Sequence, residues 1–140
     1  MKPSKTDLAY LAGIIDGEGC ITVHSTNLGI GGPYLLIGGT DKRLVIWLKN
    51  NFGGNYSEVN FTNIKHKHHK TPYLWHSSLC NTTKILELTL PYLIIKSAQA
   101  KLAIRFRRLI GTVGHSVPTI NLQKRISIVD KIRKLNRRGR

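Results

Sequence analysis

The sequence predicts an α+β domain in which a four-stranded antiparallel sheet packs one face on helices and leaves its other face open. Stretches with helical spacing of apolar residues are interrupted by pairs of short stretches with alternating apolar and polar residues. The expected order is α-β-β-α-β-β-α. With 140 residues and 41% hydrophobic residues, the chain can bury one core and is too apolar to be disordered. We expect one domain over residues 1–140, with a disordered basic tail at 136–140.

The first helix has clear signals at both of its ends. Ser4-Lys5-Thr6-Asp7 resembles a capping box, which predicts that the helix starts there. Gly17 and Gly19 are both stop signals, so the helix is expected to end at one of them.

Two hairpins are expected to form the sheet. Cys20 to Thr26 alternates and is rich in branched residues, and Tyr34 to Gly38 is extended after a glycine-rich break. Asn55 to Asn63 and Tyr73 to Cys80 form the second pair, around a basic hairpin tip at residues 64–70.

The remaining helices follow the apolar periodicity and the capping residues. They are expected at Asp41–Phe52, from a cap at Asn81 or Thr82 to Pro91 or Leu93, at Ser97–Ile110 and at Leu122–Asn136.

The charge balance favours a polyanionic partner. The chain carries 22 Lys and Arg against 7 Asp and Glu, a formal charge of +15 that is spread over every segment. Nucleic acid is therefore the expected partner, ahead of an anionic membrane, since no apolar run approaches the roughly 20 residues needed to cross a membrane. No secretory segment follows Met1, so we expect an intracellular protein in cytoplasm, nucleoid or organelle matrix, not a secreted one.

Two cysteines, Cys20 and Cys80, lie in strand-like runs without the spacing of a metal or disulfide framework. We expect both to be buried thiols. His66, His68 and His69 lack partner cysteines or carboxylates, so a zinc site is disfavoured and a tip that touches phosphates is favoured.

The most informative motif is Leu11-Ala12-Gly13-Ile14-Ile15-Asp16-Gly17-Glu18-Gly19. Small residues at helical spacing make a flat face that lets two helices approach closely. The last carbonyls of a helix have no internal partner and attract a cation. Glu18 and the Gly17 carbonyl are therefore a candidate oxygen-lined site for a divalent metal ion.

This motif resembles the signature of the LAGLIDADG homing endonucleases at six of its nine positions, with Ile14, Gly17 and Glu18 as conservative departures. The resemblance implies the fold of that family, with a saddle-shaped DNA-binding sheet. It also implies a site-specific, intron-encoded endonuclease that cuts both strands of a long, partly palindromic target with Mg²⁺ or Mn²⁺. An RNA-splicing maturase, for which intron RNA would be a partner, or a non-cleaving nucleic-acid-binding protein of the same fold is the alternative.

The resemblance also implies roles for individual residues. Glu18 stands where the family has its metal-binding acid, and the alternative is that it only caps the turn after the helix. Lys96 stands where the family has a basic residue beside the scissile phosphate, and the alternative is a solvated surface lysine. A glutamine seen in some members is missing near residue 40, where Lys42 or Arg43 could take a basic catalytic role and Asp41 resembles a helix cap.

Polar side chains on alternate positions of the strands are expected to face DNA. One face of the first strand carries Thr22, His24 and Thr26, and one face of the third carries Glu58, Asn60 and Thr62. The fourth strand is ambiguous, and we place Tyr73, Trp75 and Ser77 on the DNA side. Tyr34 and the hairpin-tip residues Lys65 and Lys67 complete the predicted DNA-binding set.

A single copy of the motif predicts a homodimer, because a flat helix face is self-complementary across a two-fold axis. The predicted interface consists of Ala9, Ala12, Gly13 and Asp16. Asp16 is expected to lie in this packing surface and to hydrogen-bond locally.

Overall fold

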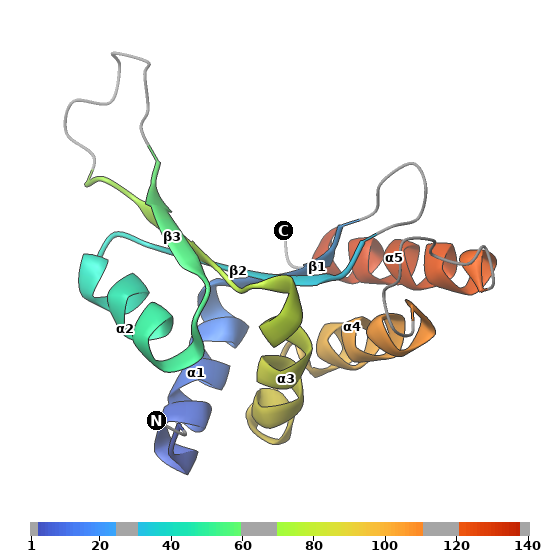
Figure 1. Cartoon of the computed structure of the whole chain (residues 1–140), viewed down its shortest axis with the longest axis horizontal. Helices are drawn as coiled ribbons and strands as arrows, with labels where there is room; N and C mark the ends of the chain where they lie inside the picture. Colours follow the sequence, from blue (N-terminus) through green and yellow to red (C-terminus); the bar gives the residue numbers. More distant parts are fainter. Residues whose placement is uncertain (1–2, 25–30, 60–69, 111–120, 138–140) are drawn as a thin grey trace.

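The computed structural model describes residues 3–24, 31–59, 70–110 and 121–137. It confirms the α+β class: a four-stranded antiparallel sheet is covered on one side by helices and is uncovered on the other (Figure 1). The strands are β1 (Gly19–Val23), β2 (Pro33–Gly39), β3 (Asn55–Glu58) and β4 (Tyr73–His76), in the order β1-β2-β4-β3.

Five helices and a short 3₁₀ turn complete the described chain. They are α1 (Lys5–Glu18), α2 (Lys42–Phe52), α3 (Leu79–Thr89), η2 (Leu90–Tyr92), α4 (Ser97–Ile110) and α5 (Leu122–Arg137). The capping box at Ser4 and Asp7 is present, and Asp41 caps α2 as predicted. None of the helices in the described part of the chain is long and apolar enough to cross a membrane.

The core lies between the sheet and the helices. Ile21, Leu35, Ile37 and Trp75 point from the strands into it and are fully buried. The indole nitrogen of Trp75 donates a 2.9 Å hydrogen bond to the carbonyl of Gly53, at the end of α2. This bond ties the centre of the sheet to the turn that follows the helix.

Gly53 and Gly54 form that turn with positive φ angles of 72° and 78°, which favour glycine. A Cβ on Gly54 would collide with the carbonyl oxygen of His76. The close approach of the turn to β4 therefore depends on glycine at position 54.

Two predicted element boundaries at the fourth strand are wrong. The strand ends at His76, and α3 begins at Leu79, so Cys80 lies in a helix. The cap is Ser78, whose carbonyl accepts hydrogen bonds from the amides of Asn81 and Thr82. The expected capping residues therefore lie in the first turn of the helix.

The predicted ends of the first and third strands also differ from the structure. β1 ends at Val23 and β3 ends at Glu58, whereas extensions to residues 26 and 63 were expected. Thr26, residues 60–69 with most of the predicted tip, and residues 138–140 of the tail lie outside the described residues. Asn136 and Arg137 belong to α5, so the predicted disorder of the tail is wrong at these two positions. Both cysteines are exposed, so the prediction of buried thiols is wrong.

Candidate functional site

The end of α1 turns directly into β1, and glycine is required at the junction. The Gly19 amide donates to the carbonyls of Ile14 and Ile15. A Cβ on Gly19 would lie 2.7 Å from the Cα of Ile15 and 2.8 Å from its carbonyl oxygen. The last glycine of the motif therefore lets the strand leave the helix sharply, and Glu18 lies at that corner.

Lys96 binds the end of this helix from the segment that leads into α4. Its ammonium nitrogen Nζ donates to the carbonyl oxygens of Ile15, at 2.8 Å, and Asp16, at 2.9 Å. A cation at the last carbonyls of a helix offsets the partial negative charge there. The structure therefore brings Lys96 and Glu18 to the same end of α1.

The Asp16 side chain in turn binds the main chain of the segment that carries Lys96. Its Oδ2 accepts hydrogen bonds from the amides of Ile94, at 2.7 Å, and Ile95, at 3.1 Å, and its Oδ1 accepts one from the Lys96 amide at 2.9 Å. Burial alone would raise the pKa of Asp16, but these three amides and the Lys96 charge lower it overall. The expectation of local hydrogen bonding is wrong, because the partners lie about 80 residues further along the chain.

Glu18 differs from every other carboxylate of the chain. The other six acidic side chains each have a hydrogen-bond or ion-pair partner: Asp7, Asp16, Asp41, Glu58, Glu87 and Asp130. Glu18 is exposed and has no such partner among the described residues. It is therefore the carboxylate available to an external ligand.

Lys42 and Arg43 lie at the start of α2, just after β2. Gly19 pairs with Ile37, so the end of β2 lies beside the corner that carries Glu18. Lys42 Nζ lies 3.6 Å from a carboxylate oxygen of Glu58, and Arg43 contacts Asp41 at 2.6 Å. Hydrogen bonds from the Arg43 side chain and amide lower the pKa of Asp41 to about 2.

The donor set at the end of α1 fits a hard divalent cation. The described residues contain no group of three or more His, Cys, Asp or Glu side chains that could hold a metal ion by themselves. Mg²⁺ commonly binds through one or two carboxylates and keeps water and substrate phosphates as its other ligands. Glu18 and the Gly17 carbonyl suit that mode of binding and do not suit a closed structural zinc site.

The open face of the sheet carries an aromatic row that crosses three strands. The His24 and Tyr34 ring centroids are 4.5 Å apart, and the Tyr34 ring stacks on His76 at 5.7 Å. Thr22 pairs with Tyr34, and His76 pairs with Leu36 and Asn55, which places these residues on the same face. Thr22, His24 and Tyr34 therefore lie where the sequence predicts.

Four other residues were assigned to the wrong face. Trp75 and Ser77 are buried on the helix side, and Tyr73 packs against the core there. Glu58 pairs with Tyr73 and contacts Lys42 of α2. Asn55, Ser57, Leu74 and His76 take the open face instead. Of the other predicted DNA-binding residues, Thr26, Asn60, Thr62, Lys65 and Lys67 lie outside the described part of the chain.

The residues of the predicted interface are divided between the core and the surface. Ala9 and Gly13 are exposed, and a Cβ on Gly13 or Gly17 would meet nothing within 4 Å. Ala12 is fully buried in the core, so its assignment to the exposed face is wrong. The exposed stripe of small residues consists of Ala9, Gly13 and Gly17.

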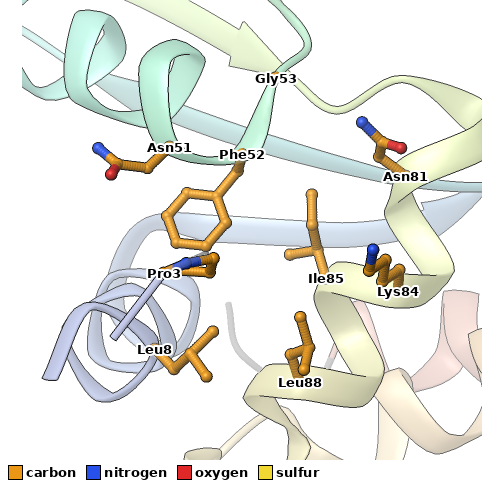
Figure 2. Close-up of a pocket in the computed structure, with 9 residues that line it drawn as sticks. All are labelled: Pro3, Leu8, Asn51, Phe52, Gly53, Asn81, Lys84, Ile85 and Leu88. Atoms are coloured by element: carbon orange, nitrogen blue, oxygen red, sulfur yellow. The ribbon is translucent and has the colours of Figure 1, made fainter. Parts of the chain in front are cut away.

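A pocket of about 670 Å³ lies apart from this site, between the start of α1, the end of α2, and α3 (Figure 2). Its wall is mostly apolar, with Leu8, Phe52, Ile85 and Leu88, and Lys84 at its side. It contains no carboxylate. The pocket therefore does not provide the oxygen ligands found at the end of α1.

A comparison with solved structures finds the same fold in several DNA-bound proteins. The homing endonuclease I-CvuI, in complex with a DNA target in the presence of Mg, matches with a TM-score of 0.72 and 21% identity, over 94% of this chain and 82% of that chain. The archaeal intron-encoded homing endonuclease I-Vdi141I, complexed with DNA, matches with a TM-score of 0.70 and 17% identity. The match covers 93% of this chain and 84% of that chain.

The LAGLIDADG meganuclease I-AabMI, bound to uncleaved DNA, matches at 0.65 and 21% identity, over 86% of this chain but only 42% of that chain. Scans against protein families and against curated proteins found no match. The structural neighbours of this chain are thus LAGLIDADG homing endonucleases, and over about 94% of its length it has their fold.

Proposed function

We propose that this chain is a site-specific DNA endonuclease that needs a divalent metal ion and makes double-strand breaks in a long, partly palindromic target. The observation that carries this proposal is Glu18, the one carboxylate without a protein partner among the described residues. It lies where α1 meets the first strand of the open sheet. The neighbours of the same fold include proteins bound to DNA, one of them with Mg.

The open face of the sheet suits DNA by its chemical groups and by charge. Its described side chains include no Asp or Glu, and they offer hydroxyl, imidazole, amide and phenol groups to base edges. The formal charge of +15 supplies a sequence-independent attraction to phosphates that weakens with salt. Recognition on this face would involve Thr22, His24, Tyr34 and His76, joined by the predicted residues of the undescribed segments.

The residues at the end of α1 divide the chemistry of cleavage between them. Glu18 and the Gly17 carbonyl would hold Mg²⁺ or Mn²⁺, which supplies an activated water and charge for the transition state. Lys96 lies beside them and adds positive charge at the same helix end. Lys42 or Arg43, after the end of β2, would contact the phosphate or its water.

We propose that two copies assemble through the stripe formed by Ala9, Gly13 and Gly17. The chain's own fold gives no packing reason for glycine at positions 13 and 17, since both face open space. Ile94 and Ile95, bound to Asp16 at the end of the same helix, are 87% and 70% exposed and would extend the contact. Contiguous exposed apolar residues of this kind mark interaction surfaces.

The lengths of the neighbours support the same assembly. The chain aligns with less than half of I-AabMI, but with over four fifths of I-CvuI and I-Vdi141I. Two copies of this chain would provide two Glu18 residues, one for each DNA strand. The protein would act inside a cell, wherever its DNA target resides.

A selection on random DNA tests the proposal directly. Purified protein is incubated with a randomised duplex library in Mg²⁺, in Ca²⁺ and with chelator, and both the cut ends and the retained DNA are sequenced. We expect defined double-strand cuts in Mg²⁺ only. Selective retention without cuts in any metal would instead indicate a maturase or a non-cleaving binding protein.

Glu18→Gln is the decisive variant, because it keeps the side-chain shape and removes the charge that binds the metal. We expect it to retain DNA and to lose cutting. Glu87→Gln, at an exposed acid on α3, is the matched control and should cut like the wild type. Cutting by Glu18→Gln at the wild-type rate would overturn the metal assignment.

A further inference from the structure

We propose that Asp16 is a positioning residue for cleavage: it fixes the Lys96 segment, and through Lys96 it fixes the end of α1 that carries Glu18. This inference rests on the proposed function, which supplies the reaction that the positioning serves. It assigns Asp16 a role inside each protomer in place of the predicted role in the dimer interface.

The two helix ends exchange charged groups of opposite sign. Residues 94–96 come directly before α4, and the Asp16 carbonyl lies in the last turn of α1, where carbonyls lack helical partners. Asp16, from α1, supplies a carboxylate to the amides that lead into α4. Lys96, from that segment, supplies an ammonium to the carbonyls that end α1.

These five hydrogen bonds form a closed loop between two short segments. Asp16 holds the main chain of Lys96, while the side chain of Lys96 holds the main chain of Ile15 and Asp16. Removal of either side chain therefore weakens the hydrogen bonds that hold the main chain next to the other. Glu18 lies two residues beyond Asp16, so this loop anchors the main chain next to the proposed metal-binding carboxylate.

The same contacts argue against Asp16 as a direct metal ligand. Both of its carboxylate oxygens already accept backbone hydrogen bonds, three in total. Glu18 has no such bonds among the described residues. Residues that orient a metal ligand without touching the metal commonly change metal affinity or activity by roughly 10- to 100-fold when they are replaced.

The experiment uses four variants of the full chain and one control. Asp16→Asn weakens the bonds to the amides, Lys96→Met removes the ammonium, the double variant combines both changes, and Lys96→Arg keeps the positive charge. Asp130→Asn, at an exposed acid of α5, controls for the gain in nonspecific DNA affinity that follows the loss of any acid.

Three readouts separate positioning from a general loss of stability. DNA affinity is measured in Ca²⁺ and the single-turnover cleavage rate is measured against Mg²⁺ concentration. Amide hydrogen exchange at residues 94–96 is measured without metal or DNA, so that it does not depend on activity. If Asp16→Asn does not fold, Lys96→Met carries the test, because it leaves the side chain of Asp16 and its amide partners in place.

We expect the DNA affinity of Asp16→Asn in Ca²⁺ to stay within about threefold of the Asp130→Asn control, while the Mg²⁺ that it needs for half-maximal cleavage rises roughly 10-fold or more. Exchange at residues 94–96 should accelerate in both single variants. The double variant should be no worse than the worse single one, and Lys96→Arg should recover part of the loss.

Additive effects of the two single variants on cleavage, or unchanged exchange in Lys96→Met, would overturn the inference. So would an unchanged Mg²⁺ requirement in Asp16→Asn. If the wild-type chain itself cuts no DNA, the proposed function fails, whereas the exchange measurement still reports whether the two helix ends hold each other.

Discussion

The two faces of the sheet are built from the same strands, but one packs against the helices and the other is open. On the helix side, Ile37 and Trp75 are fully buried neighbours, and the Trp75 indole is bonded to Gly53. On the open side, Tyr34 and His76 stack on each other and remain partly accessible. The alternation of a strand thus separates residues that hold the fold from residues free to recognise a ligand.

The same separation applies to the glycines of the motif. Gly19 faces the backbone of Ile15, within the chain, whereas Gly13 faces open space. The first is explained by the fold of one chain and the second is not. A residue that the fold itself does not require is the better candidate for contact with another molecule.

The largest difference in stability is expected between the two faces of the sheet. Trp75→Ala removes a fully buried ring and its hydrogen bond, and should lower the free energy of unfolding by about 3–5 kcal/mol. Tyr34→Ala should cost less than about 1 kcal/mol, the size of a cross-strand pair, and should weaken DNA binding. Denaturant unfolding and DNA titration measure the two effects, and equal losses of stability would contradict the comparison.

A smaller difference is expected between the two glycines. Gly19→Ala forces the Ile15 backbone to move and should destabilise the fold by about 1–3 kcal/mol. Gly13→Ala should change the free energy of unfolding by less than about 1 kcal/mol, the scale of helix propensity. Thermal unfolding at equal protein concentration compares them, and a Gly13→Ala penalty as large as that of Gly19→Ala would show that Gly13 packs inside the chain.

Dimer formation through the exposed stripe of small residues is tested by measuring the size of the protein in solution. Gly13→Leu should fold normally, since its surroundings are open, and should sediment as a monomer. Ser127→Leu, at an exposed position on α5, adds the same bulk elsewhere and should leave the dimer intact. An undisturbed Gly13→Leu dimer would refute the interface.

The cysteines distinguish the two sides without altering stability. Both thiols are exposed, so both should react with a maleimide in the free protein. Cys20 is the second residue of β1 and lies on the open side, opposite Leu36, whereas Cys80 lies in α3. Bound DNA should protect Cys20 alone, with Cys20→Ser and Cys80→Ser variants assigning the signals, and protection of Cys80 would place DNA on the helices.

The smallest effect is expected at the start of α2. The folded pKa of Asp41 is about 2, below its ordinary 3.8, so its contribution is complete above 3.8 and is lost as pH falls through 2. Asp41→Ala should therefore shift the unfolding temperature slightly at pH 7 and not at all well below pH 2. An equal shift at both values would mean that the charge of Asp41 is irrelevant to the cap.

Local signals in the sequence were sufficient for much of this fold. The capping box at Ser4, the cap at Asp41 and the bounds of α4 are set by neighbouring residues, and all were predicted. Thr22 was placed correctly because Ile21 and Val23 on either side of it are unambiguously apolar.

The predictions were wrong where contacts with residues distant in the sequence determine the structure. The residue types of β4 are compatible with either face of the sheet. The hydrogen bond from Trp75 to Gly53 and the pairing with β2 decide which side chains are buried. The role of Asp16 depends on amides about 80 residues away, which no local pattern reports. The motif singles out Glu18 in the sequence, but only the structure reveals that Glu18 has no partner among the described residues.

Beside β1, the side-chain amide of Asn136 in α5 donates a 3.0 Å hydrogen bond to the carbonyl of Ile21. β1 is an edge strand, and an uncovered edge can recruit a strand from another chain. α5 follows β1 in the chain, so β1 is synthesised before the helix that packs beside its edge. Removal of α5 should therefore expose the edge of β1, and we expect the first sign of that change to be poor solubility.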